Sequence, residues 1–163
     1  MKCMNCGAEM KTKQEDYTYE ESGLPVVLKD VEVSRCPECG ELEVSIPNVE
    51  GLHRAIAQYV IQKRERLAAA EIRYLRKCLG ASAVEFASCM GVAPETVSRW
   101  ETGAQSMGGV AERLLRLMVA SKEPVKARAC EWLAYVAQED PVPQTLGLTV
   151  GDNHRWRVEP CYA

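Results

Sequence analysis

Two copies of the motif Cys-x-x-Cys-Gly restrict what this chain can fold into: "CMNCG" at residues 3–7 and "CPECG" at residues 36–40. Two residues between cysteines let both sulfurs turn toward one ion, and the glycine after each pair relaxes that turn. Cys3, Cys6, Cys36 and Cys39 together supply the four ligands of a tetrahedral zinc ion. We predict a structural zinc site, because four thiolates leave no coordination position open for catalysis.

The segment around these cysteines is too small to fold on apolar burial alone. Fewer than 50 residues with few large apolar side chains bury too little surface to offset chain entropy. A structural zinc ion would contribute roughly 10 kcal/mol or more of apparent folding free energy. Between the pairs, "YTYEESGLPVVLKDVEVSRC" alternates β-branched and polar residues around Gly23-Leu24-Pro25, which predicts short antiparallel strands. We therefore expect a β-rich zinc module over residues 1–47.

Two other uses of paired cysteines stay open as alternatives. A redox Cys-x-x-Cys normally occurs once, within a βαβ pattern that is absent here. Disulfides are rare in the cytosol, and we expect a cytoplasmic protein because no apolar run is long enough to span a membrane and the N-terminus lacks the apolar centre of a signal peptide. The other four of the eight cysteines have no paired spacing, and we expect them to be small buried apolar residues.

Charge is distributed unevenly along the chain. Residues 1–50 have a net charge of −6, residues 51–128 a net charge of +6 and residues 129–163 a net charge of −3. The middle segment is therefore the part suited to a polyanion, and the first segment is a candidate surface for a basic protein. Apolar residues make up 47% of the sequence and charged residues 26%, as in a globular protein.

The remaining segments read mainly as helices. Asn48 is a suitable N-cap for a connecting helix of about 17 residues within residues 48–68. Short helices punctuated by Gly80, Gly91 and Gly103 follow within residues 69–120. The last of these has Val110, Leu114, Leu117 and Met118 on one side. The pattern of residues 121–163 predicts one more helix after Pro124 and a β-hairpin around Gly151-Asp152-Asn153. The sequence assigns no role to this segment.

Residues 79–103 have the pattern of a helix-turn-helix. Two short helices meet at Gly91-Val92-Ala93, with predicted buried faces formed by Val84, Phe86, Ala87 and Met90 on one and by Val97 and Trp100 on the other. A plain helical corner in a bundle gives the same spacing. The outward residues of the second helix, Glu95, Thr96, Ser98 and Arg99, are polar and favour DNA reading. Candidates for phosphate contacts are Lys63, Arg64, Arg66, Arg73, Arg76 and Lys77.

The expected fold class is thus α+β: a small N-terminal zinc-bound β-rich module followed by an all-α helix-turn-helix domain. The stretch "LRKCLGASAVEFASCMGVAPETVSRWETG", followed by "AERLLRLM", resembles the helix-turn-helix of the Cro/repressor (XRE) family. Joined to "C..CG … C..CGE", it resembles the MqsA-type antitoxins, which are also described as having a YgiT-type zinc finger. The similarity covers residues 1 to about 120.

The resemblance implies a function and assigns roles to residues. In that family the zinc module engages a basic ribonuclease toxin, and the C-terminal module dimerises and represses its own operon. Cys3, Cys6, Cys36 and Cys39 match the zinc ligands, and Arg99 matches the base-reading arginine. Two departures keep the operator sequence from being transferred: Glu95 stands where the family has a base-reading asparagine, and Ala83 stands where it often has a polar phosphate contact.

Three functions follow as hypotheses. The first is a non-enzymatic antitoxin of a type II toxin–antitoxin pair, with structural zinc, a toxin partner, a homodimer and double-stranded operator DNA. The second is a stand-alone or phage-type zinc-containing repressor without a toxin. The third is a thiol oxidoreductase or zinc enzyme, for which the sequence offers no Glu/His pair and no catalytic residue.

Overall fold

The computed structural model describes residues 1–122 and 145–160, so the helix expected after Pro124 lies outside the described residues. The chain forms two compact units. The first consists of residues 1–21, 25–52 and the described residues from 145 onward, and the second of residues 22–24 and 53–122. The predicted α+β class is confirmed, because within the described residues three strands and the four clustered cysteines precede five helices, and two further strands of the same sheet follow them. No helix in the described ranges has the length and apolar character of a membrane span.

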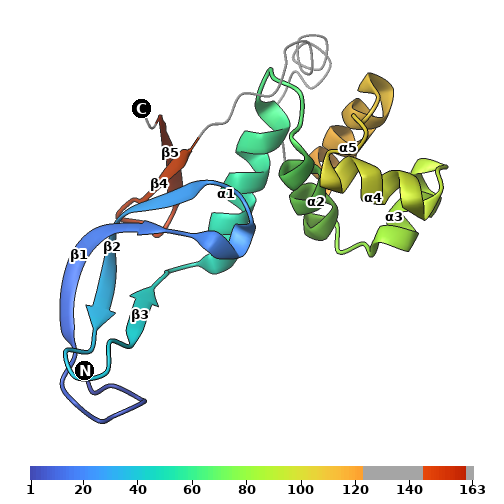
Figure 1. Cartoon of the computed structure of the whole chain (residues 1–163). Coiled ribbons are helices and arrows are strands. Elements are labelled where there is room, and N and C mark those ends of the chain that lie inside the picture. The colour runs from blue at the N-terminus through green and yellow to red at the C-terminus, as the bar shows by residue number, and fades with distance from the viewer. Residues whose placement is uncertain (123–144, 161–163) are drawn as a thin grey trace. The chain divides into compact units, whose positions relative to one another are not determined.

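The first unit is built around one long central strand, β2 (Val26–Arg35). Strand β1 (Lys11–Thr18) pairs antiparallel with β2 along its length, with a register shift between Glu15 and Tyr17. The other edge of β2 is shared: β3 (Leu42–Ser45) pairs antiparallel with residues 32–35, and β4 (Leu146–Val150) pairs parallel with residues 26–28. Figure 1 shows β1 and β2 as long curved neighbours. A 3-10 turn, η1 (Glu20–Ser22), follows β1.

The C-terminal hairpin completes this sheet. Strand β4 turns back into β5 (Trp156–Pro160) through a tight loop in which the Gly151 amide donates to the Arg155 carbonyl at 2.9 Å. Leu146 and Leu148 of β4 are buried beside Val26 and Leu28 of β2. The hairpin therefore closes the core of the N-terminal unit, although more than 100 residues separate the two segments in sequence.

The start of α1 (Val49–Gln62) is tied to the same hairpin. The Asn48 side chain accepts a hydrogen bond from the Gly51 amide at 3.0 Å, which confirms Asn48 as the N-terminal cap, and donates to the His154 carbonyl at 3.3 Å. The Trp156 indole donates to the carbonyls of Pro47 and Asn48 at 3.1 and 3.2 Å.

The second unit is helical. Helix α2 (Ala69–Cys78) is followed by α3 (Ala83–Met90), α4 (Pro94–Thr102) and α5 (Gly109–Lys122). Helices α3 and α4 meet at Gly91, whose φ of 65° is the left-handed conformation that a tight helix-ending turn requires. Helix α4 packs on α2 and α3, and α2 also packs on α5. The core residues of this unit include Ile72, Leu75, Phe86, Val97, Trp100, Leu115 and Val119.

Leu148→Ala is expected to destabilise the first unit by about 2–5 kcal/mol, because Leu148 is fully buried and its truncation leaves a cavity. Val158→Ala on β5 is the control, since Val158 is 38% exposed and should change stability little. Urea unfolding of both variants with metal present measures the difference. Equal midpoints for the two variants would show that β4 is not part of the cooperative core.

Candidate metal centre and nucleic-acid interface

The two cysteine loops have the same backbone geometry. In each, the amide of the glycine donates to the carbonyl of the first cysteine: Gly7 to Cys3 at 2.9 Å and Gly40 to Cys36 at 3.0 Å. In each, the amide of the first cysteine donates to a carbonyl five residues on, of Ala8 at 2.8 Å and of Glu41 at 2.9 Å. Gly7 and Gly40 have φ of 76° and 75°, which favours glycine. The local sequence therefore makes two matching loops, each presenting two sulfurs.

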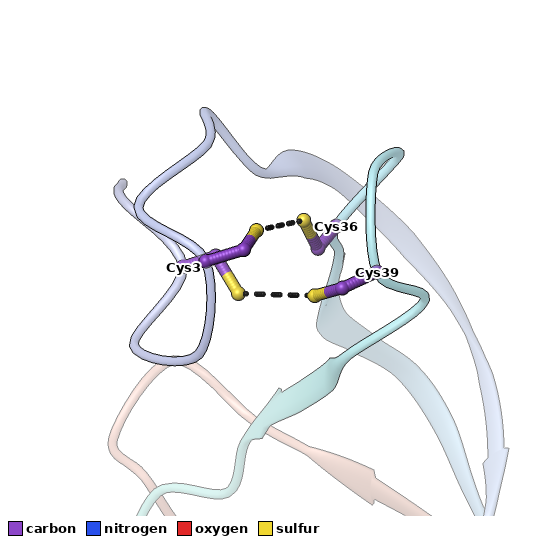
Figure 2. Close-up of side chains that lie close together, drawn as sticks. Cys3, Cys36 and Cys39 are labelled. Carbon is purple, nitrogen blue, oxygen red and sulfur yellow. Dashed lines mark hydrogen bonds between the residues drawn. The ribbon is translucent and has the colours of Figure 1, made fainter.

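The four sulfurs converge. All four Sγ atoms lie within 4.8 Å of one another; Cys3 and Cys39 are 3.5 Å apart and Cys6 and Cys36 are 3.3 Å apart. Figure 2 shows Cys3 on one loop facing the loop that carries Cys36 and Cys39. Four sulfurs at about 2.3 Å from a tetrahedral zinc ion are about 3.8 Å apart. The arrangement fits a single metal ion bound by four sulfur donors.

Each loop buries its first cysteine and exposes its second. Cys3 and Cys36 pack against the buried Met10, with Ala8 beside them, whereas Cys6 and Cys39 face solvent. The backbone amides of Cys39 and Glu38 lower the pKa of Cys36 to about 7, so the thiolate that a metal needs is accessible near neutral pH. The Ala8 amide acts to lower the pKa of Cys6, but the neighbouring thiols of Cys36 and Cys39 raise it to about 12. The metal-free cluster therefore does not ionise as a whole, and metal binding must release protons.

The second helix of the helix-turn-helix presents a polar face. Glu95, Ser98 and Arg99 of α4 are exposed and Thr96 is half-buried, whereas Val97 and Trp100 are buried against the other helices. Pro94 occupies the first turn and Ala93 caps α4 without a side-chain hydrogen bond. The structure thus places the four predicted reading residues within the first six residues of one helix, with the two predicted apolar anchors on its inner side.

The predicted buried face of α3 is wrong at one position. Phe86 and Ala87 are buried and Met90 is partly buried, as expected, but Val84 is 64% exposed. The reason is helical geometry: Val84 lies two residues from Phe86, about 200° around a helix of 3.6 residues per turn. The apolar character of Val84 alone therefore does not predict that it is buried.

Several of the cations expected to contact phosphate are used inside the helical unit. Lys63 pairs with Glu71 at 2.7 Å, Arg66 with Glu112 at 2.6 Å and Arg76 with Glu101 at 2.5 Å. Glu101 raises the pKa of Arg76, and it also pairs with Arg73 at 3.4 Å. Arg64 and Lys77 are exposed. The connecting helix is also shorter than expected, because α1 ends at Gln62 and the "KRER" that follows lies outside the helix.

The side of helix α5 on which the sequence places Val110, Leu114, Leu117 and Met118 is largely exposed, and two charged residues of the helix are buried. Val110, Leu114 and Leu117 are 82%, 40% and 47% exposed, whereas Glu112 and Arg116 are 1% and 0% exposed. Arg116 donates to the carbonyls of Ile61, Lys63 and Glu65 at 2.6–3.1 Å and to Glu112 at 2.8 Å. Glu112 also accepts from the Leu67 amide at 3.1 Å.

This polar lock, formed by Glu112, Arg116 and Arg66, holds the segment after α1 against α5. Sequence reasoning missed it because a Glu and an Arg four residues apart are a common pattern on an exposed helix face. The one available sign was that the apolar residues of α5 form two stripes, of which only one can face the core.

A family model matches most of the chain. The family described as the antitoxin component of bacterial toxin-antitoxin system, MqsA, matches residues 1–125. That range contains both cysteine pairs and helices α1 to α5, and the β4–β5 hairpin lies beyond it. No curated protein matches the chain.

Cys36→Ser is expected to abolish metal binding and unfold the first unit, since three sulfurs cannot complete the site. Elemental analysis measures the metal, and NMR of the amides follows each unit. Cys89→Ser is the matched control, because Cys89 is exposed on α3 rather than buried as expected. Retention of one metal ion per chain in Cys36→Ser would contradict a four-sulfur site.

Glu112→Gln is expected to destabilise the helical unit by about 3–5 kcal/mol, because it leaves Arg116 buried without a counter-charge. Urea unfolding followed by helical circular dichroism measures the loss. Arg113→Ala, an exposed change on the same helix, should alter stability by less than about 0.5 kcal/mol. Similar midpoints for the two variants would mean that the lock contributes nothing.

Proposed function

Because the chain belongs to the MqsA antitoxin family, we propose that it binds a toxin protein and, as a homodimer, represses its own operon by sequence-specific binding to double-stranded operator DNA. The observation that carries the proposal is the presence, in one chain of this family, of a four-thiol unit and a helix-turn-helix unit of opposite charge. Members of this family are generally not enzymes, and we assign no catalytic residue. We place the protein in the cytoplasm, where its thiols stay reduced.

The metal is zinc in this proposal. Zinc prefers tetrahedral sulfur coordination and needs no redox partner. Cys3, Cys6, Cys36 and Cys39 hold it, and their separation supports one ion shared by both loops. Its role is structural, because it joins the N-terminal loop to the end of β2.

The first unit is the toxin-binding part. Residues 1–50 have a net charge of −6, which complements a basic ribonuclease. Complementary charge raises the rate of encounter and disfavours acidic partners. Folding of this acidic surface depends on the metal site, so toxin binding requires metal.

The helical unit is the DNA-binding part. The N-terminal half of α4 enters the major groove, where Glu95, Thr96, Ser98 and Arg99 face the base edges. An arginine can donate two hydrogen bonds to the O6 and N7 atoms of guanine, and this is the role assigned to Arg99. The exposed Arg64 and Lys77 are the remaining candidates for phosphate contacts.

The exposed stripe of α5, formed by Val110, Leu114 and Leu117, supports the homodimer. Apolar residues three and four positions apart form one continuous face of a helix, and a two-fold axis brings that face against its copy. Two reading helices related by this axis contact half-sites about one helical turn apart.

Co-expression with the neighbouring gene tests the antitoxin role. We expect a stable complex with a small basic protein that arrests growth when expressed alone, and tighter binding to the operon's promoter than to random duplex of equal length. A promoter preference without a toxic neighbour would instead favour a stand-alone zinc-containing repressor. Absence of any duplex preference would refute the repressor part.

Arg99→Ala is expected to weaken operator binding by about 1–3 kcal/mol and to relax the sequence preference at one base pair per half-site. Arg64→Ala is the control, because loss of a phosphate contact weakens binding to every duplex alike and lowers the salt dependence. Fluorescence anisotropy at several salt concentrations separates the two effects. If Arg99→Ala behaved like Arg64→Ala, the base-reading role would belong to another residue.

A further inference from the structure

We propose that Glu95 reads a cytosine in each operator half-site, beside a guanine read by Arg99. This inference rests on the proposed DNA-binding function and goes beyond it by naming the base that the acidic residue selects. The N-terminal turn of α4, the reading helix, presents the Glu95 carboxylate where contact with polyanionic DNA is expected, which is unusual.

The fold orients Glu95 outward together with Arg99. Val97 and Trp100 are 0% and 5% exposed, and their burial fixes the rotation of α4 about its axis. Glu95 and Arg99 are exposed and four residues apart, so they lie on one face of the helix. Ser98 shares this exposed face.

The Glu95 carboxylate has no role inside the fold. Within residues 1–122 and 145–160, neither the Glu95 carboxylate nor the Arg99 guanidinium has a hydrogen-bond or ion-pair partner. Two other carboxylates of the helical unit, by contrast, have partners within the fold. Glu85 accepts from the Ser82 amide at 2.8 Å in a capping box, and Glu101 binds Arg76. An exposed, unpartnered acid and base on one helical face are available to contact a ligand.

A carboxylate selects cytosine by its hydrogen-bonding character. An ionised carboxylate only accepts hydrogen bonds. Guanine and thymine present acceptors in the major groove, cytosine presents its N4 amino donor, and adenine combines an N6 donor with the N7 acceptor. Cytosine is therefore the one base that offers a donor without a competing acceptor.

The spacing of the two residues also fits adjacent reading positions. Four residues of α-helix rise about 6 Å, and base pairs are about 3.4 Å apart, so Glu95 and Arg99 reach positions within two base steps of each other. The positive N-terminal end of α4 and the Arg99 charge offset the repulsion between Glu95 and phosphate.

Two other roles for Glu95 make different predictions. Glu95 could only stabilise the positive end of α4, in which case its removal changes stability and leaves base preference intact. It could instead orient Arg99, in which case its removal weakens the guanine preference and creates none elsewhere. Glu95→Gln separates these roles, because glutamine keeps the shape and pairs with the N6 and N7 atoms of adenine.

The experiment selects bound sequences from a randomised duplex library with wild-type protein, Glu95→Gln and Glu43→Gln, all metal-loaded and full length. Glu43 is exposed on β3, an element of the other unit, so Glu43→Gln makes the same change in net charge outside α4. We expect the wild type to enrich cytosine at one position per half-site. Glu95→Gln should shift that position toward adenine, with the cytosine-to-adenine ratio changing about 5- to 150-fold, and Glu43→Gln should keep the wild-type preference.

Two results overturn the inference while leaving the proposed function intact. One is an unchanged preference in a Glu95→Gln protein whose unfolding curve matches the wild type, and the other is a loss of guanine preference with no new base selected. A wild-type protein that enriches no sequence would overturn both the inference and the repressor function.

Discussion

Four thiols brought together from two distant loops are the constraint on which the N-terminal unit depends. Without a cation, gathering thiolates is unfavourable because like charges repel, and the metal-free cluster keeps its protons in part, as the raised pKa of Cys6 indicates. With an ion bound, the same sulfurs join the chain start to the end of β2. Only a small apolar group, Met10 with Ala8, covers the buried cysteines. Because so little apolar packing holds the loops, we expect metal binding and folding of this end of the unit to be one event.

In the helical unit, a buried ionic network holds the segment at the end of α1 against α5. Arg116 donates to three backbone carbonyls, of Ile61 in the last turn of α1 and of Lys63 and Glu65 just after it, and Glu112 neutralises it. Removing one member of such a network costs far more than the network contributes relative to apolar residues. The network places Glu112 and Arg116 of α5 inside the unit, while the apolar stripe of Val110, Leu114 and Leu117 stays exposed.

The sequence predicts the parts of this structure whose causes are local. Each cysteine loop depends on five residues. Helix α4 is defined by Pro94, Gly103 and the spacing of Val97 and Trp100. The type and position of these elements follow from short-range chemistry. The orientation of α5 could not be derived, since two apolar stripes compete and the choice depends on carbonyls 51 to 55 residues away in sequence. The pairing of β4 with β2 was equally hidden, because parallel pairing leaves no turn signature between its two strands. The ion pairs of Lys63 and Arg76 with carboxylates likewise form only in the tertiary structure, so the sequence pattern did not predict them.

The parallel pairing of β4 with β2 has a consequence for how the molecule is made. Residues 26–28 leave the ribosome about 120 residues ahead of Leu146–Leu148, their partners in the sheet. At ordinary elongation rates this interval lasts on the order of ten seconds. Helices α2 to α5 are translated within it. Throughout that time this stretch of β2 has unpaired amides and carbonyls, the kind of edge that other strands can join. A nascent chain therefore carries a template for strand addition that the completed protein covers with its own hairpin.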